Sequence, residues 1–463
     1  MRKIERSPFY GQIFRLVAPI VLQNLLSAAV SSADVVMLNF VGQSAISAVS
    51  LASQYAHVLF MVFYGLGTGA TMLCAQYFGK KDFRAIEVVQ GIALRFSLTF
   101  SIVFALLALT VPQYMMLVFT NDPELIALGS GYIRILSVCY LCWGVTEVYI
   151  SILRSVGRVA VGTVLNSVAV GLNVLLNAVF IFGWLGAPKL GVSGVALATS
   201  ISRLVELGLC FVVSARSKEV KLKFSAIFVR NKALFTDFIK LSLPALANDI
   251  VWGLAFSVYS VIIGHLGNDA VAANSLATVV RNFGTILCFG LASAGGVLLG
   301  QKIGEGRLEE ARADGRRLLW LTVASGAVGG AIVLIARPFV MMYAQANFTK
   351  EALGYLGVML LINSYYIMGC AVNTTLIAGA FRAGGDSRFG LICDVITMWV
   401  YAVPLGFFSA FVLKLPVLWV YFLLCTDEFV KWPWVLKHYA SGKWIKNITR
   451  DNLFEENQAQ PAE

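Results

Sequence analysis

Long apolar stretches alternate with short polar gaps along the whole chain. A helix needs about 20 apolar residues to cross the hydrocarbon core of a bilayer, and reading between charged or turn-forming gaps gives twelve such stretches. They cover residues 12–40, 45–77, 87–111, 126–154, 161–183, 190–214, 235–263, 270–302, 314–338, 352–379, 387–411 and 414–438. This pattern predicts an all-α membrane protein with twelve transmembrane helices.

The gaps between these stretches differ in charge. Most Lys and Arg residues lie in the gaps after the even-numbered stretches and at the two ends of the chain. The opposite gaps carry only Lys189, Arg337, Lys350 and Lys414. Because basic loops stay on the cytoplasmic side, both termini are predicted to be cytoplasmic.

The chain contains an internal repeat. A shift of 225 residues places Pro19 on Pro244 and Gly42 on Gly267 without a gap. Each half then holds six spans, an even number, so both halves enter the membrane in the same direction. Such a repeat predicts two six-helix bundles related by a pseudo-two-fold axis along the membrane normal.

The repeat also predicts the domain boundaries. We expect one bundle at residues 1–214, a basic cytoplasmic linker at 215–234 and a second bundle at 235–450. The polar tail, 451–463, is expected to be disordered. The basic start of residues 1–33 is typical of a signal peptide, but the apolar stretch is too long for one and belongs to the repeat.

Composition supports the membrane assignment. The apolar fraction is 58%, the charged fraction 13% and the mean hydropathy +0.78, whereas soluble domains carry roughly 45–50% apolar and about 25% charged residues. The net charge of +11 is spread over the gaps and not gathered on one face, so no nucleic-acid partner is expected.

Two other classes of site are not indicated. The eight cysteines all lie inside apolar stretches, and the three histidines are scattered, so neither set predicts a metal site or a cofactor. No HExxH, GxSxG or GxxxxGK[ST] motif is present, so the chain is not expected to be an enzyme. A membrane-embedded enzyme is therefore the weakest alternative.

Several motifs carry a family resemblance. They are Gly65-Leu-Gly-Thr-Gly69, Leu153-Arg-Ser-Val-Gly157, Gly191-Val-Ser-Gly-Val-Ala-Leu-Ala-Thr199 and Phe381-Arg-Ala-Gly-Gly-Asp386. With Pro19 and Asp34 in the first span, they occur in an order that resembles the multidrug and toxic compound extrusion (MATE) transporters, of the prokaryotic DinF-like type. The resemblance implies a monomeric transporter in a bacterial cytoplasmic membrane. It implies export of small organic cations, drugs or amphiphilic metabolites by antiport, driven by sodium or proton entry.

The resemblance also implies where the coupling ion binds. Relatives of this type use an acidic residue in the first span, and Asp34 occupies that place. Their fifth span carries an Asn followed four residues later by an Asp, and here the pair is Asn173 and Asn177. We expect Asp34, Asn173 and Asn177 to hold a sodium ion or a proton. Glu147 and Thr199 are further candidates for ion or substrate contact.

Charged residues also occur inside the spans of the second half. Ionisable groups within a membrane are functional candidates by default. Asp249 and Arg281 lie at similar depth and could pair, Asp427 and Glu428 precede Lys431, and Asp394 matches Asn166 through the repeat. These residues predict either structural ion pairs or a second ion site, and both readings stay open: Asp249, Arg281, Asp394, Asp427 and Glu428. The nearest alternative function is a flippase for lipid-linked oligosaccharides or other lipids from the same superfamily.

Overall fold

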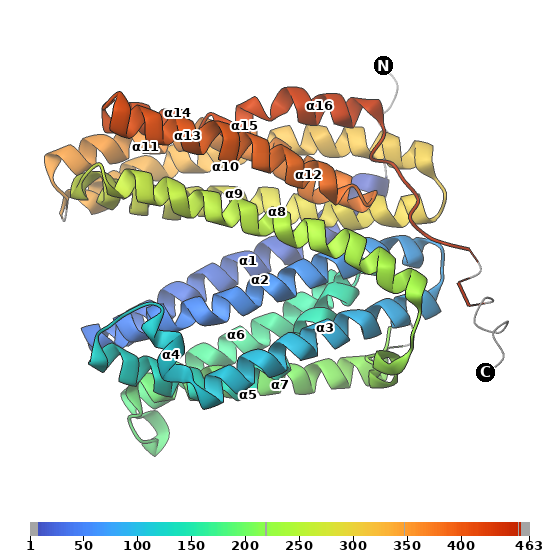
Figure 1. Cartoon of the computed structure of the whole chain (residues 1–463), viewed down its shortest axis with the longest axis horizontal. Helices are drawn as coiled ribbons and strands as arrows, with labels where there is room; N and C mark the ends of the chain where they lie inside the picture. Colours follow the sequence, from blue (N-terminus) through green and yellow to red (C-terminus); the bar gives the residue numbers. More distant parts are fainter. Residues whose placement is uncertain (1–7, 218–219, 347, 452, 455–463) are drawn as a thin grey trace. The chain divides into compact units, whose positions relative to one another are not determined.

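The computed structural model of the chain describes residues 8–217, 220–346, 348–451 and 453–454. Every regular element in these ranges is a helix, and Figure 1 shows the helices with their labels. Eleven of the described helices are long and apolar enough to cross a membrane. The prediction of an all-α membrane fold is therefore confirmed.

The helices of the first half follow the predicted spans closely. Their order is α1 (Pro8–Asn39), α2 (Gln43–Gly79), α3 (Phe83–Thr110), α4 (Pro112–Leu117), α5 (Pro123–Ser155), α6 (Val159–Phe182), η1 (Trp184–Gly186), α7 (Gly191–Arg216) and η2 (Phe224–Phe228). The short helix α4 lies in the gap after the third span. The helical turn η2 forms within the predicted linker.

The second half has the same long helices at its start, but its last spans are divided into shorter segments. Its elements are α8 (Lys232–Gly264), α9 (Asn268–Gly304), α10 (Leu308–Gln345), α11 (Lys350–Thr374), η3 (Thr375–Phe381), α12 (Ser387–Asp394), η4 (Val395–Ala402), α13 (Val403–Phe407), η5 (Phe408–Val412), α14 (Val417–Leu424), α15 (Asp427–Val430) and α16 (Trp432–Ser441). The segments η3, η4 and η5 are π-helical continuations of the helices before them.

Local backbone geometry confirms the sequence repeat. Helices α2 and α9 are both 37 residues long. Each begins after a glycine with positive φ, +136° at Gly42 and +119° at Gly267. Because a residue with a Cβ is strained in that region, the two matched glycines permit the same sharp turn before the second helix of each half.

Contacts divide the chain into two compact units, and the division does not follow the predicted linker. One unit contains Leu22–Leu246 with Arg450–Glu463, and the other contains Met1–Val21 with Ala247–Thr449. The first part of α1 thus belongs with the helices of the second half. The first part of α8 belongs with the helices of the first half.

Matched contacts show how this exchange is built. Val17 and Val21 of α1 lie against Gly290 of α9. Through the same shift of 225 residues, Ser242 and Leu246 of α8 lie against Gly65 and Gly69 of α2. In both helices a proline, Pro19 or Pro244, lies in the exchanged part and removes one backbone hydrogen bond there.

The predicted span 414–438 is wrong as a continuous helix. The chain forms α14, then turns at Cys425 and Thr426, and continues as the four-residue α15 and the ten-residue α16. The breaks flank three buried charged residues, Asp427, Glu428 and Lys431. Their side chains bond to other helices, which a straight apolar helix would not allow.

The chain after α16 returns to the unit formed by the first half. Arg450 donates two hydrogen bonds to the Asp237 carboxylate, at 2.6 and 2.7 Å. Asp451 pairs with Lys80, and the Arg84 guanidinium lies 4.2 Å from the ring centre of Phe454. The predicted disorder of the tail otherwise falls on residues outside the described part.

Candidate functional site

A polar cluster joins two helices of the first half. Asn173 and Asn177 are four residues apart on α6, so they share one face of that helix. The Asn173 amide nitrogen donates to the Thr199 hydroxyl on α7 at 3.1 Å. The Asn177 amide nitrogen donates to the Asn173 side-chain oxygen at 3.3 Å. Three of the predicted site residues are therefore in direct contact, and Asn177 is fully buried.

The Thr199 hydroxyl has a second bond that fixes its orientation. It donates to the backbone oxygen of Val195, one turn earlier on α7, at 3.0 Å. The Thr199 hydroxyl oxygen therefore accepts the hydrogen bond from Asn173 while the hydroxyl proton is donated to Val195. The cluster thus presents side-chain oxygens at a defined place inside an apolar bundle, and such oxygens suit hard cations.

Asp34 lies in α1, but its side chain is outside the described part of the structure. Its approach to Asn173 and Asn177 therefore stays a prediction. Glu147 lies on α5 and is partly buried. Its nearest charged neighbours are Arg154, Arg203 and Glu206.

Arg203 and Glu206 form an internal ion pair on α7. The guanidinium donates to the Glu206 carboxylate at 2.7 Å, and it also lies 4.9 Å from the ring centre of Trp143. Arg203 therefore pairs with the carboxylate on its own helix. This leaves Glu147 without an ion pair within 4.0 Å among the described residues.

The second half contains a larger charged network centred on Lys431. Its ammonium lies 2.9 Å from Asp394, 3.0 Å from Glu428 and 4.0 Å from Asp427. All four side chains are at most 6% exposed. Asp427 and Glu428 thus lie within ion-pair distance of Lys431, which is one of the two readings that the sequence left open, and Asp394 joins them from α12.

Three neutral polar side chains extend this network to two more helices, α8 and α11. Asn373 of α11 donates to the Glu428 carboxylate at 2.6 Å, and the Tyr259 hydroxyl of α8 donates to Asp427 at 3.3 Å. Asn248 of α8 donates to Asp394 at 2.6 Å. The amides and the hydroxyl were not singled out from the sequence as partners, since nothing in their local pattern distinguishes them from other polar residues in spans.

Arg382 links the network to Asp249. Its guanidinium donates to Asn248 at 2.9 Å and to the Asp249 carboxylate at 2.7 Å. The predicted pairing of Asp249 with Arg281 is therefore wrong, because Asp249 is bound by an arginine from the segment after η3. Within the network, four carboxylates face two basic groups, and buried charge of this kind is stabilised only while its hydrogen bonds are complete.

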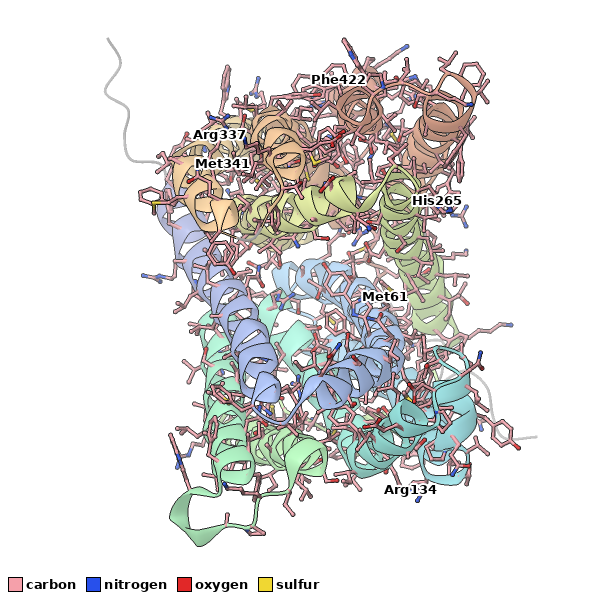
Figure 2. The ribbon with its side chains drawn as sticks, turned by 90° about the vertical axis from the view of Figure 1, so that its left-hand side faces the viewer. Met61, Arg134, His265, Arg337, Met341 and Phe422 are labelled. Atoms are coloured by element: carbon pink, nitrogen blue, oxygen red, sulfur yellow. The ribbon has the colours of Figure 1, made fainter. Side chains whose placement is uncertain are left out.

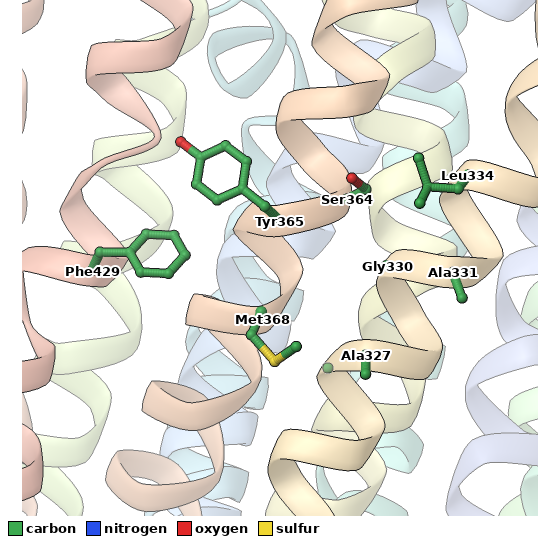
Figure 3. A pocket seen from close by; sticks show the side chains of 9 residues that line it. Ala327, Gly330, Ala331, Leu334, Ser364, Tyr365, Met368 and Phe429 are labelled. Atoms are coloured by element: carbon green, nitrogen blue, oxygen red, sulfur yellow. The ribbon is translucent and has the colours of Figure 1, made fainter.

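An apolar groove lies between α10 and α11. It has a volume of about 410 Å³, and its walls include Gly326, Gly330, Met368 and Phe429. Figure 3 shows Ser364 and Tyr365 beside it. The groove has no carboxylate or basic side chain in its lining, so it offers nothing that would bind an ion.

Metal-ligand clusters are not found in the described ranges. No group of three or more His, Cys, Asp or Glu residues there could hold a metal ion. His265 is exposed at the end of α8, as Figure 2 shows, and its Nδ1 lies 2.9 Å from the Val261 carbonyl oxygen. The predicted sodium site depends instead on Asp34, Asn173 and Asn177.

These features define a multi-pass transporter of the membrane, with polar groups buried inside two repeated helical units. The chain belongs to the MatE family, whose model matches residues 19–179 and 244–408. The matched ranges coincide with the internal repeat. Members of this family are transporters and not enzymes, so that prediction is confirmed.

Individual relatives agree with this assignment over most of the chain. An uncharacterised transporter of Bacillus subtilis, YisQ, is 23% identical over 440 residues, 94% of this chain and 95% of that protein. A probable multidrug resistance protein NorM of Thermotoga maritima is 22% identical over 456 residues, 96% of this chain and 95% of that protein. A crystallised mutant of the Vibrio cholerae MATE transporter VcmN has a TM-score of 0.84 at 17% identity, covering 95% of this chain and 99% of that chain.

Proposed function

We propose that the protein is a cation-coupled antiporter that exports organic cations, drugs or amphiphilic metabolites by alternating access. Sodium or proton entry supplies the driving force. The observation that carries the proposal is the polar cluster of Asn173, Asn177 and Thr199, whose three side chains meet inside an otherwise apolar bundle. Membership of the MatE family supports it.

The proposed mechanism requires that the ion and the substrate bind with highest affinity to different conformational states of the protein. A carboxylate at Asp34 would supply the charge, and the Asn173 and Asn177 oxygens would replace part of the ion's hydration shell. A ligand shifts a conformational equilibrium only by its difference in affinity between the two states. Ion and substrate must therefore stabilise opposite-facing states for their fluxes to be coupled.

The experiment is flux in liposomes that contain the purified full-length protein. Efflux of a fluorescent organic cation is measured under an imposed sodium gradient, an imposed proton gradient and neither. We expect one gradient to accelerate efflux, and we expect Asp34→Asn to abolish that acceleration. Equal efflux by Asp34→Asn and wild type under the same gradient would contradict the assignment.

A matched control separates coupling from folding. Glu124 lies in the exposed first turn of α5, away from the polar cluster, so Glu124→Gln should leave the gradient dependence unchanged. Asn177→Ala should weaken the response to the driving ion without removing it, since one oxygen ligand is lost and the charge is kept.

The proposal includes a topology and an assembly state. We propose that both termini face the cytoplasm of a bacterial cell, because the basic gaps and the basic ends lie on one side of the predicted spans. We also propose that one chain is sufficient for transport. Labelling of single cysteines introduced in the gaps from either side of the membrane tests the first statement.

A further inference from the structure

Arg281 is a partly buried cation that lies beside aromatic rings. It lies thirteen residues after the start of α9, about 20 Å along the helix at 1.5 Å per residue. A guanidinium stays protonated in proteins. Its principal electrostatic neighbours are Tyr421, Tyr366 and the thiols Cys425 and Cys370.

Within the described part of the chain, Arg281 makes no ion pair and no hydrogen bond. Two other arginines of the helical units differ in this respect. Arg203 pairs with Glu206, and Arg382 pairs with Asp249. Burying a charge without a counter-charge is costly, and the described residues supply no hydrogen-bond acceptor to the Arg281 guanidinium.

Aromatic rings surround this guanidinium on two sides. Its carbon lies 5.0 Å from the ring centre of Phe256 and 5.5 Å from that of Tyr366. Contact with ring faces partly stabilises a buried cation, but it leaves the N–H groups unused. The side chain is also not completely covered by protein atoms, so a ligand can reach it.

A second donor beside Arg281 lacks an acceptor. The Tyr366 side chain is 2% exposed, and its hydroxyl has no hydrogen-bond partner among the described residues. The neighbouring Tyr421 differs, because its hydroxyl donates to Asn363 at 2.8 Å. Two donors, the partly buried guanidinium and the buried hydroxyl, therefore lie together without hydrogen-bond acceptors among the described residues.

An apolar wall continues from this pair of donors. The Phe256 ring contacts Trp252, with centroids 4.5 Å apart, and Trp252 contacts Phe289 at 6.3 Å. These rings come from α8 and α9, and Phe289 is 37% exposed. A row of aromatic surface that ends at a guanidinium complements a molecule with an apolar body and an anionic group.

We propose that Arg281 and Tyr366 bind the anionic group, a carboxylate, sulfonate or phosphate, of an amphiphilic substrate. The guanidinium donates two hydrogen bonds to oxygens of the anion. The Tyr366 hydroxyl donates a third hydrogen bond to an oxygen of the same group. The rings of Phe256, Trp252 and Phe289 cover the apolar body. This assignment rests on the proposed export function, and it narrows the amphiphilic metabolites among the proposed substrates to those that carry a negative charge.

The test compares three probes that share one fluorophore: dansylglycine is anionic, dansylamide neutral and dansylcadaverine cationic. Their binding to the purified protein in detergent is measured by fluorescence. We expect wild type to prefer dansylglycine, and we expect Arg281→Gln to lower its affinity at least about tenfold, since hydrogen bonds to a charged group are lost. Affinity for dansylamide should change less than twofold. Equal affinities of wild type for dansylglycine and dansylamide would overturn the assignment.

Two further variants keep the test decisive if Arg281→Gln folds poorly. Arg281→Lys retains the charge but not the two-pronged geometry, so a partial loss specific to dansylglycine is expected. Tyr366→Phe removes only the hydroxyl and should also weaken dansylglycine selectively. The exposed Arg134→Gln is the control and should bind all three probes as wild type does. Unchanged dansylglycine binding in both Arg281→Lys and Tyr366→Phe would contradict the proposal.

A lipid headgroup presents the same chemistry as a free amphiphile. Phosphatidylglycerol and phosphatidylcholine are therefore added separately to the micelles. Competition by phosphatidylglycerol alone assigns the site to an anionic lipid, whereas no competition by either assigns it to a free amphiphile. Flux separates this proposal from the function on which it rests. Selective dansylglycine binding without gradient-driven efflux of either dansylglycine or the organic cation would reject the antiporter and retain the anion site.

Discussion

At the scale of single residues, the interior of this protein is organised by how each charge is paired. Lys431 touches three carboxylates, and Arg382 joins Asp249 to Asn248. Removing one member of such a network leaves others buried without a partner, which costs more than the pair itself contributes. Lys431 is the residue whose loss would leave the largest number of unpaired groups.

Lys431→Met should therefore destabilise the protein strongly. Methionine keeps a similar length but removes the ammonium between Asp394 and Glu428. A loss of about 3–5 kcal/mol in the free energy of unfolding is expected, as for breaking a buried ion pair. Thermal unfolding in detergent measures it.

Lys437→Met is the matched control, because Lys437 is exposed on α16. Its unfolding temperature should stay near that of wild type. An Lys431→Met protein as stable as the Lys437→Met protein would show that the three carboxylates do not depend on this ammonium.

The sequence could not predict the partners of most charged residues. Asp249 and Arg382 are 133 positions apart, and similar depth in the membrane made Arg281 an equally good candidate for Asp249. The position of a residue along a helix fixes the depth of its side chain in the membrane. It does not fix the direction in which the side chain points around the helix axis. The cluster of Asn173, Asn177 and Thr199 was easier to predict, because two members share a helix face and the third lies in a motif of the resembling family.

At the scale of helices, sequence patterns predicted most ends within a few residues, although α10 extends six residues before and seven residues beyond the predicted span 314–338. Apolar runs, polar gaps and caps are local signals, and Asp82 and Thr349 cap α3 and α11 through their side chains. The twelfth span failed because its charged residues face other helices and interrupt it. No local sequence pattern predicts that the starts of α1 and α8 belong to different units from the rest of these helices. Pro19 and Pro244 lie close to the two points where the units divide.

Close helix packing provides a prediction at this scale. A Cβ on Gly330 of α10 would lie 2.4 Å from the backbone oxygen of Ser364 on α11. Because that atom belongs to a helix backbone, Gly330→Ala should push the two helices apart. We expect a loss of about 1–3 kcal/mol, the usual result of overpacking, measured by thermal unfolding.

Gly354→Ala is a control on α11 itself. Nothing lies within 4 Å of a Cβ at Gly354. Alanine favours helix over glycine by about 1 kcal/mol, so this variant should be as stable as wild type or slightly more stable. Equal stability of the two alanine variants would argue against tight contact between α10 and α11.

At the scale of the whole molecule, each compact unit contains chain from both halves of the sequence. The start of α1 lies against α9, and the start of α8 lies against α2. The two units are therefore joined by exchanged helix ends as well as by the linker. This arrangement predicts how a divided chain behaves.

A chain divided between residues 217 and 220 should still assemble when both fragments are made in one cell. A tag on the first fragment should retain the second on an affinity column in detergent, since each fragment supplies a helix end to the other. Deleting residues 1–21 from the tagged fragment should markedly reduce the recovery of its partner. Quantitative recovery after that deletion would contradict the role of the exchanged ends.

The exchange also bears on how such a chain arose. The internal repeat implies duplication of a gene that encoded one half. In a half-length chain, the start of the first helix would have no partner within the same chain. It could pack against the matching glycines only in a second copy. A half-length chain with the same contacts is therefore expected to form a pair of identical subunits that exchange these helix ends.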